Sequence, residues 1–296
     1  MVIKKSVGDY IFDIFNYTFL FILSIVFLYP LYYVLMASFS EPLQLLGHNG
    51  LLLRPLGFVL DGYRIVLRNP NILSGYINTI YVVVVGTTIN MIMTVLGAYV
   101  LARKDLYLKK VFMIMIIITM YFSGGMIPSF LLVRGLGMFD TRMALVIPTA
   151  IATWNLIIMR TAFMRVPEEL AESGKIDGAN DFTILWKITL PLVKATLAVM
   201  VLFYAVAHWN SFMPAVMFLR SRNLFPLQVI MREILITHAA GGNLVEAGLG
   251  ADEALAWIDV ILPYATIIVA TVPILFIYPF CQKYFTKGVM LGSLKG

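Results

Sequence analysis

The chain is poor in the charged residues with which soluble domains cover their surfaces. Only 13% of its 296 residues are charged, whereas soluble domains contain about a quarter. Apolar residues account for 60% of the sequence, and the mean hydropathy is +0.89. A chain of this composition has too little polar surface to enclose an apolar core in water. It is therefore predicted to be an integral membrane protein with several spans.

Residues that carry catalysis or bind metal ions are also scarce. The single cysteine, Cys281, excludes an internal disulfide and a thiolate metal site, and we expect it to serve in packing. The three histidines are too dispersed to suggest a metal site, and neither a His-Glu-x-x-His motif nor a Walker A glycine loop occurs. The sequence therefore predicts a non-catalytic protein that binds no metal or cofactor and does not hydrolyse ATP itself.

Six apolar runs without Asp, Glu, Lys or Arg approach or exceed the roughly 20 residues that a spanning helix needs. The second run begins at Asn69, but its opening sequence Asn69-Pro70-Asn71 is typical of a loop. The fourth run is short, and we extend it past Arg160, whose long side chain can reach the polar interface. The prediction is an all-α protein whose spans cover about residues 14–40, 77–102, 111–133, 143–162, 195–219 and 260–282.

Lysine and arginine are divided unevenly between the segments that connect the spans. With the N-terminus in the cytoplasm, the inner segments hold 14 of the 22 basic residues, including every lysine, and the outer loops hold eight arginines. Positive charge is enriched on the cytoplasmic side of membrane proteins. We therefore expect both termini and the segment 166–192 in the cytoplasm. This distribution explains the net charge of +6 without a nucleic-acid partner.

Several polar and aromatic side chains, but no carboxylate, lie within the predicted spans. His208-Trp209-Asn210 belongs to the fifth span and Trp154-Asn155 to the fourth. Polar groups in hydrocarbon face the interior of the helix bundle or a wet cavity. These residues either line a transport pathway, where an aromatic ring beside amide groups suits a sugar, or form hydrogen bonds between helices. The lack of carboxylates argues against a carrier driven by protons.

Two of the predicted outer loops are long. The loop between the first two spans is rich in proline and glycine, and we expect it to be irregular with one short helix near residues 60–67. The loop between the last two spans has a glycine-rich centre that includes Gly241, Gly242 and Asn243. Long loops without regular structure are usually functional or disordered. We expect residues 237–250 to contact a soluble partner outside the membrane; the alternative is a plain connection.

The segment 166–192 concentrates seven charged residues between two charge-free runs. Pro167 suits the first position of a helix, where its missing N–H is not needed. Glu168 and Glu169 then place negative charge at the positive end of the helix dipole. Gly178 permits a positive φ, and the Asp and Asn residues around it favour a turn. The first part of the segment is therefore predicted to be a short helix that ends in a turn.

A second short helix is predicted to follow this turn. Asp181 can cap its first turn, and Leu190-Pro191 marks its end. Its apolar residues recur at helical spacing and give it one apolar face. They are Phe182, Ile184, Leu185 and Ile188. The whole segment is predicted to be a helix–turn–helix unit outside the bilayer that presses against another protein.

Five residues of this segment also lie at fixed distances from one another. They are Glu172, Gly178, Ile188, Leu190 and Pro191. Their spacing resembles the EAA loop (E-A-A-x3-G-x9-I-x-L-P) of bacterial ABC importer permeases. The two alanines of the family pattern are replaced by Ser173 and Gly174, which are also small. The alternative is an ordinary amphipathic connection between membrane helices.

The resemblance implies a fold and a set of partners. It implies one transmembrane domain over residues 1–296 with the ABC type I importer permease fold, in the cytoplasmic membrane of a bacterium. In that family the EAA loop docks into a cleft of a cytoplasmic ATPase dimer, which uses ATP and Mg²⁺. A second permease, related but different in the maltose-type systems, and an extracytoplasmic binding protein complete the transporter. The residues that would contact the ATPase are Glu169, Glu172, Ser173, Gly174, Asp177, Gly178, Ala179, Phe182, Ile188, Leu190 and Pro191.

Other parts of the chain resemble the maltose-type permeases more specifically. The pair Trp209-Asn210 is similar to a W-N pair that follows the coupling loop in sugar importers. The loop that holds Gly241 corresponds to one that meets the binding protein, and the tail 283–296 is similar to a tail that reaches the ATPase. The sequence Glu169–Ser173 resembles permeases for oligosaccharides, including acidic ones such as alginate or pectin fragments. The expected function is ATP-driven carbohydrate import, and the alternative is a stand-alone secondary carrier or channel.

Overall fold

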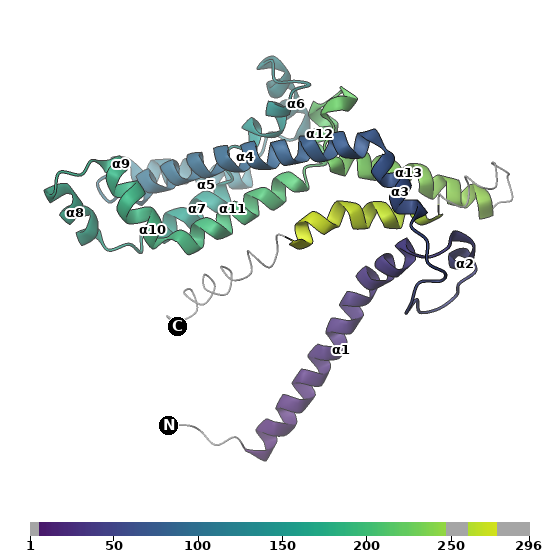
Figure 1. Ribbon diagram of the computed structural model, residues 1–296. Helices are drawn as coiled ribbons and strands as arrows, with labels where there is room; N and C mark the ends of the chain where they lie inside the picture. The colour runs from purple at the N-terminus through teal and green to yellow at the C-terminus, as the bar shows by residue number, and fades with distance from the viewer. Residues whose placement is uncertain (1–5, 247–259, 277–296) are drawn as a thin grey trace. The chain divides into compact units, whose positions relative to one another are not determined.

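The computed structural model describes residues 6–246 and 260–276 (Figure 1). All regular structure in these two ranges is helical. The chain divides into two compact units, which are described in turn. The first comprises Met1–Asn69 and Met231–Val272, and the second comprises Pro70–Ile230 and Pro273–Gly296.

The first unit begins with the long apolar helix α1 (Val7–Ser38). Its start is fixed by a capping box, in which the Asp9 N–H donates to Ser6 Oγ (3.4 Å) and the Ser6 N–H donates to Asp9 Oδ2 (2.7 Å). The helix therefore begins seven residues before the predicted span 14–40, in the turns that carry the capping acid. Most apolar side chains of α1 are exposed, as expected for a helix that faces lipid.

Two short helices follow α1, namely α2 (Pro42–Leu46) and α3 (Asp61–Arg68). The position of α3 confirms the helix predicted near residues 60–67, whereas α2 was not predicted. The helix Val260–Phe276 packs against α3, where a Cβ on Gly62 would lie 3.2 Å from the Cβ of Ala265. The core of this unit consists of Ala37, Leu45, Leu52 and Ile261.

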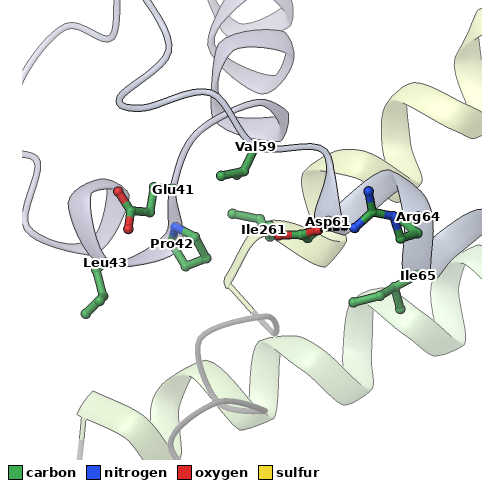
Figure 2. Close-up of a pocket in the computed structure, with 8 residues that line it drawn as sticks. All are labelled: Glu41, Pro42, Leu43, Val59, Asp61, Arg64, Ile65 and Ile261. Carbon is green, nitrogen blue, oxygen red and sulfur yellow. Dashed lines mark hydrogen bonds and ion pairs between the residues drawn. The ribbon is translucent and has the colours of Figure 1, made fainter.

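A pocket of about 410 Å³ lies between these elements of the first unit (Figure 2). Its polar side chains are Glu41, Asp61 and Arg64, and the last two form an ion pair of 2.9 Å. The third polar side chain is the carboxylate of Glu41, and the other residues that line the pocket are apolar. None of the predicted site residues lines this pocket.

The second unit is built on α4 (Pro70–Ala102), which packs against α7 (Thr153–Phe163) and α11 (Lys194–Trp209). The prediction that Asn69-Pro70-Asn71 forms a loop was wrong, since α4 begins at Pro70. Proline at the first helical position is already set in the required φ and has no N–H to leave unpaired. The buried residues where these three helices meet are Val95, Ala98, Leu101, Leu156, Met159, Phe163 and Met200, within a cluster that also reaches Leu185.

Three of the predicted spans are bent or broken. The run 111–133 forms α5 (Lys109–Tyr121) and α6 (Met126–Gly135), which meet at 114°. Gly125, at a φ of +85°, lies in the break between them. The run 143–162 forms two short 3-10 helices, Arg142–Leu145 and Ile147–Thr149, which precede α7 at a bend of 50°.

The predicted span 195–219 also consists of two helices. Helix α11 ends at Trp209, and α12 (Met213–Phe218) starts after a short break. Pro214 lies in the first turn of α12, where its missing N–H does no harm, although it could not continue α11 without loss of a hydrogen bond. A hydropathy pattern does not distinguish such a break from a continuous helix.

Among the residues that the structure describes, two helices, α1 and α4, are each long and apolar enough to cross a membrane, and the count reaches five if every bent pair is one span. The described part of the last helix, Val260–Phe276, is apolar but shorter than these two. The six predicted spans and the cytoplasmic termini therefore stay predictions. The end of the last predicted span, at 277–282, and the tail 283–296 lie outside the described residues.

The expectation of an irregular glycine-rich loop after the fifth span was wrong for residues 227–246, which form α13 (Leu227–Glu246). The start of α13 is fixed to α4, because the Leu227 N–H donates to Thr79 Oγ1 at 2.8 Å. Gly241, Gly242 and Asn243 lie within this helix.

Candidate functional site

The segment 166–192 folds as two helical pieces joined by a tight turn. They are α8 (Glu168–Ile176) and a continuous stretch, Asp181–Leu192, composed of α9 (Asp181–Thr183), a π-helix (Ile184–Thr189) and α10 (Leu190–Leu192). Figure 1 shows them at one end of the second unit, where α4 ends and α11 begins, while α6 and α12 lie toward the other end of α4. The predicted helix–turn–helix is therefore confirmed as a structure.

The turn is a Schellman motif, in which two N–H groups beyond the helix bond back to its last carbonyls. The Gly178 N–H donates to Lys175 O (3.0 Å), and the Ala179 N–H donates to Gly174 O (2.9 Å). Gly178 has a φ of +81°, which glycine adopts without the steric cost that a side chain would add. The predicted bend at Gly178 is confirmed.

The second helical piece begins one residue earlier than predicted. Asn180, rather than Asp181, is its N-cap, and its side chain accepts a hydrogen bond of 2.8 Å from the Thr183 N–H. The piece also continues past Pro191 to Leu192. Since Pro191 has no N–H to donate, the α-helical bond at this position is lost. Directly before Leu190-Pro191 the backbone is a π-helix, in which hydrogen bonds span five residues instead of four.

The two pieces pack closely because residue 174 is glycine. A Cβ at Gly174 would lie 2.9 Å from Ile188 Cδ1 and 3.4 Å from Ile184 Cγ1. Ile184 and Leu185 are fully buried within this chain, and Ile188 is partly buried. The prediction that all four apolar residues of the second helix form one docking face was therefore wrong. Apolar spacing showed which residues avoid water but not which protein covers them.

The apolar surface that the segment exposes is made of other residues. Ile176 is 86% exposed, Phe182 66% and Trp186 60%. Sequence reasoning missed Ile176 and Trp186. Exposed large side chains are common in this chain, but these three lie on a segment of high charge, and that combination could have identified them. The acidic side chain of Glu172 is also exposed and makes no hydrogen bond or ion pair with the described residues.

The remaining predicted contact residues divide between the surface and the interior of the segment. Glu169, Ser173, Asp177 and Pro191 are exposed, and Ala179 is partly exposed. Gly174 and Leu190 are buried, so they shape the segment without meeting a partner. The exposed residues among the predicted contact residues therefore all lie on one small unit that consists of two short helical pieces.

The polar residues predicted to line a pathway occupy different environments. His208 is buried and lies 2.6 Å from Asn90 Oδ1 of α4, and its ring fits only because residue 86 is glycine. Asn155 is buried on α7, whereas Trp154 is largely exposed. Contact between helices accounts for His208.

Trp209 and Asn210 lie at the end of α11. Trp209 is buried, with its ring edge-on to that of Tyr76 at 6.3 Å between centroids. Its Nε1 has no hydrogen-bond partner within the part of the chain that the structure describes, and the same holds for the buried hydroxyls of Ser211 and Thr87. Asn210 is exposed and donates from Nδ2 to Val206 O at 3.0 Å. Buried donors without partners are costly, so the Trp209 Nε1 hydrogen is expected to have a partner other than the residues that the structure describes.

The chain is similar in sequence to permease proteins of transport systems. No family model matches the chain. The chain is 40% identical to the "Polygalacturonan/rhamnogalacturonan transport system permease protein YtcP" of Bacillus subtilis (strain 168), over 97% of this chain and 99% of that protein. It is 36% identical to the "Protein LplC" of the same organism, over 97% of this chain and 95% of that protein.

The fold is also similar to that of a solved transporter. A chain of the "Crystal structure of a bacterial ABC transporter involved in the import of the acidic polysaccharide alginate" matches with a TM-score of 0.85 and 32% identity. The match covers 95% of this chain and 99% of that chain. The similarity therefore extends over nearly the whole chain and is not restricted to the segment 166–192.

Proposed function

The chain belongs to the permease subunits of ABC carbohydrate importers, and on this basis we propose that residues 166–192 couple it to a separate cytoplasmic ATPase. The transporter would lie in the cytoplasmic membrane of a bacterium and take up acidic oligosaccharides. ATP and Mg²⁺ would be used by the ATPase alone. A second, related permease and an extracytoplasmic binding protein would complete the assembly.

The observation that carries the coupling role is the surface of this segment, which we call the coupling segment. Ile176, Phe182 and Trp186 are exposed on a unit that is too charged to lie in lipid. A group of exposed apolar side chains with a polar rim is typical of a protein interface. Glu172 is exposed on α8, one helical turn before Ile176, and is available for a basic group of the ATPase.

The connections of the coupling segment explain how it would transmit movement. It follows α7 and precedes α11, so both helices are covalently attached to its ends. Helices α7 and α11 both pack against α4. Closure of the ATPase dimer would draw two such segments together, one from each permease, and would tilt the attached helices as rigid bodies. The side of the membrane to which the pathway opens would change as a result.

The proposed substrate class rests on the relatives and on charge. Two of the three similar proteins described above have names or titles that mention polygalacturonan and the acidic polysaccharide alginate. Every basic residue in the predicted outer loops is an arginine, which binds carboxylates in a bidentate manner. Arg142 is held in place by Asn78 (3.0 Å) and lies 5.0 Å from the Tyr81 ring centroid. Trp209 and Tyr76 would line the pathway with an aromatic surface.

Replacement of Gly178 tests the coupling role. A Gly178→Val variant cannot adopt a φ of +81° without strain, so it should disrupt the Schellman turn. We expect the ATPase to be lost on co-purification and ATP-dependent uptake of labelled trigalacturonate to fall at least tenfold, with normal membrane insertion.

Gly137→Val is the matched control, because Gly137 has a similar φ of +71° and open space around it but lies outside the coupling segment. This control should retain the ATPase. Normal uptake by Gly178→Val, or uptake by the purified permease without any ATPase, would instead favour a stand-alone carrier.

A further inference from the structure

The turn between α4 and α5 contacts both pieces of the coupling segment through ion pairs. Arg103 Nη1 lies 2.8 Å from Asp181 Oδ1, and Lys104 Nζ lies 2.5 Å from Glu168 Oε2. Glu168 is the first residue of α8, and Asp181 is the first residue of the second helical piece. The turn therefore holds each piece at its N-terminal end. We call these two contacts the linking ion pairs.

Arg103 is oriented for this contact by a residue of its own turn. Its Nε and Nη2 donate to the two carboxylate oxygens of Asp105, at 2.9 and 2.7 Å. Hydrogen bonds from Arg103 are the main reason that the pKa of Asp105 is lowered to about 2, and they raise the pKa of Arg103. A bidentate pair fixes the plane of the guanidinium, so that the remaining Nη1 is directed at Asp181.

The turn is also firmly joined to the transmembrane helices. Lys109 Nζ of α5 donates to the carbonyls of Ala102 (3.2 Å) and Arg103 (2.7 Å), and Arg160 Nε of α7 donates to Leu101 O (3.0 Å). These cationic groups lie at the C-terminal end of α4, where the last carbonyls have no partners within the helix. Movement of the turn would therefore be transmitted to α4, α5 and α7.

The covalent connections of the coupling segment are bent. The second piece meets α11 at 88°, with a break at Val193, and α8 is separated from α7 by Met164–Pro167. Such junctions are places where a segment can swing relative to the helices that it should move. A contact between the coupling segment and a helix to which it is not covalently joined would limit this swing.

We propose that Arg103 and Lys104 are positioning residues for energy coupling, because the linking ion pairs make α4 and α5 move together with the coupling segment. This inference rests on the proposed function. The stroke of the ATPase would then reach α4 and α5 directly, in addition to the covalent route through α7 and α11. The Lys104–Glu168 pair is exposed and the Arg103–Asp181 pair is partly exposed, and ion pairs at the protein surface contribute little to folding stability. Their loss should therefore leave the transporter assembled but allow ATP hydrolysis without transport.

The first test measures efficiency in the complete transporter, reconstituted with its ATPase, second permease and binding protein. We expect Lys104→Gln combined with Asp181→Asn to lower trigalacturonate uptake per ATP hydrolysed by about threefold or more, a size consistent with exposed ion pairs. The amount of bound ATPase and the thermal midpoint should not change. Lys110→Gln, at an exposed lysine of the same region, is the control.

A charge exchange separates positioning from a general effect of lost charge. Lys104→Glu should reduce uptake per ATP, and Lys104→Glu with Glu168→Lys should restore it, since the exchanged pair can form again. Wild-type efficiency in the Lys104→Gln/Asp181→Asn variant would overturn the proposal. Failure of the exchange to rescue would do so as well, provided that the exchanged variant keeps the thermal midpoint of the wild type, because Glu168→Lys places a positive charge at the N-terminus of α8.

A second measurement does not depend on the sugar. Spin labels at Tyr107→Cys and Lys187→Cys, in a Cys281→Ser background, report the distance between the turn and the coupling segment. In the otherwise wild-type protein this distance should be the same in the nucleotide-free and the vanadate-trapped states. In the variant that lacks the linking ion pairs it should differ between the two states. A change of distance in the wild type would overturn the proposal, whereas a wild type that binds no ATPase would overturn the proposed function itself.

Discussion

Gly174 illustrates how a single residue determines the shape of the coupling segment. Considered alone, a glycine in a helix costs about 1 kcal/mol relative to alanine. The structure shows what the glycine allows, since the side chains of Ile184 and Ile188 occupy the space where a larger residue would lie. The motif that the segment resembles has alanine at this position, so the two effects can be separated by substitution.

Gly174→Ala should change stability by less than about 1 kcal/mol, because the gain in helix propensity offsets the movement required of the flexible end of Ile188. Gly174→Val should destabilise the segment by about 1–3 kcal/mol, since its second branch meets Ile184 as well. Thermal unfolding of the purified permease and recovery of the ATPase would measure both variants. Equal behaviour of the two would contradict the packing argument, and Ile188→Val should partly rescue Gly174→Val.

At the scale of the element, local chemistry predicted some features well and others not at all. The turn at Gly178 was predictable because glycine and its neighbours determine it without help from the rest of the fold. The breaks near Gly125 and Pro214 were not predicted. These runs are apolar on both sides of the bend, and a hydropathy profile does not show where a helix changes direction. The inward orientation of Ile184 and Leu185 was not predictable either. Leu185 belongs to a buried cluster with residues of α4 and α7 that are distant in sequence, and Ile184 packs against Gly174 across the turn.

Asp140 connects two elements that the sequence did not suggest were neighbours. It has a φ of +60°, and its carboxylate accepts hydrogen bonds from the backbone N–H groups of Arg220 and Ser221, both at 2.8 Å, and from Ser221 Oγ at 2.5 Å. These bonds, with the Ser221 hydroxyl first among them, lower the pKa of Asp140. They join the loop after α6 to the loop after α12.

Asp140→Asn should therefore lower the thermal midpoint at neutral pH. A carboxyl whose pKa is lower in the folded state stabilises the fold above its ordinary pKa of about 3.9, and this contribution is lost as the pH falls through the lower folded value. The difference between the wild type and the variant should thus be greatest at neutral pH and should diminish in acid. Asparagine tolerates the same positive φ, so strain should not contribute. A difference that is independent of pH would exclude the charge as its cause.

At the scale of the whole molecule, composition was sufficient to predict a helical membrane protein, and the spacing of five residues pointed to the family. Orientation in the membrane rests on the distribution of lysine and arginine, which has no counterpart in the contacts of the folded chain. The length and apolar surface of helices such as α1 and α4 do not determine which end faces which side of a bilayer. The side on which the coupling segment lies must therefore be measured in a membrane.

Cysteine labelling in intact cells tests this orientation. In a Cys281→Ser background, Phe58→Cys should react with a membrane-impermeant maleimide added from outside, since Phe58 is exposed in the predicted outer loop. Ile176→Cys, although even more exposed, should react only after permeabilisation, and bound ATPase should then slow the reaction because it covers this surface. Labelling of Ile176→Cys from outside would place the coupling segment on the wrong side for any cytoplasmic motor. In that case neither the proposed docking nor the linking ion pairs could transmit the energy of ATP hydrolysis.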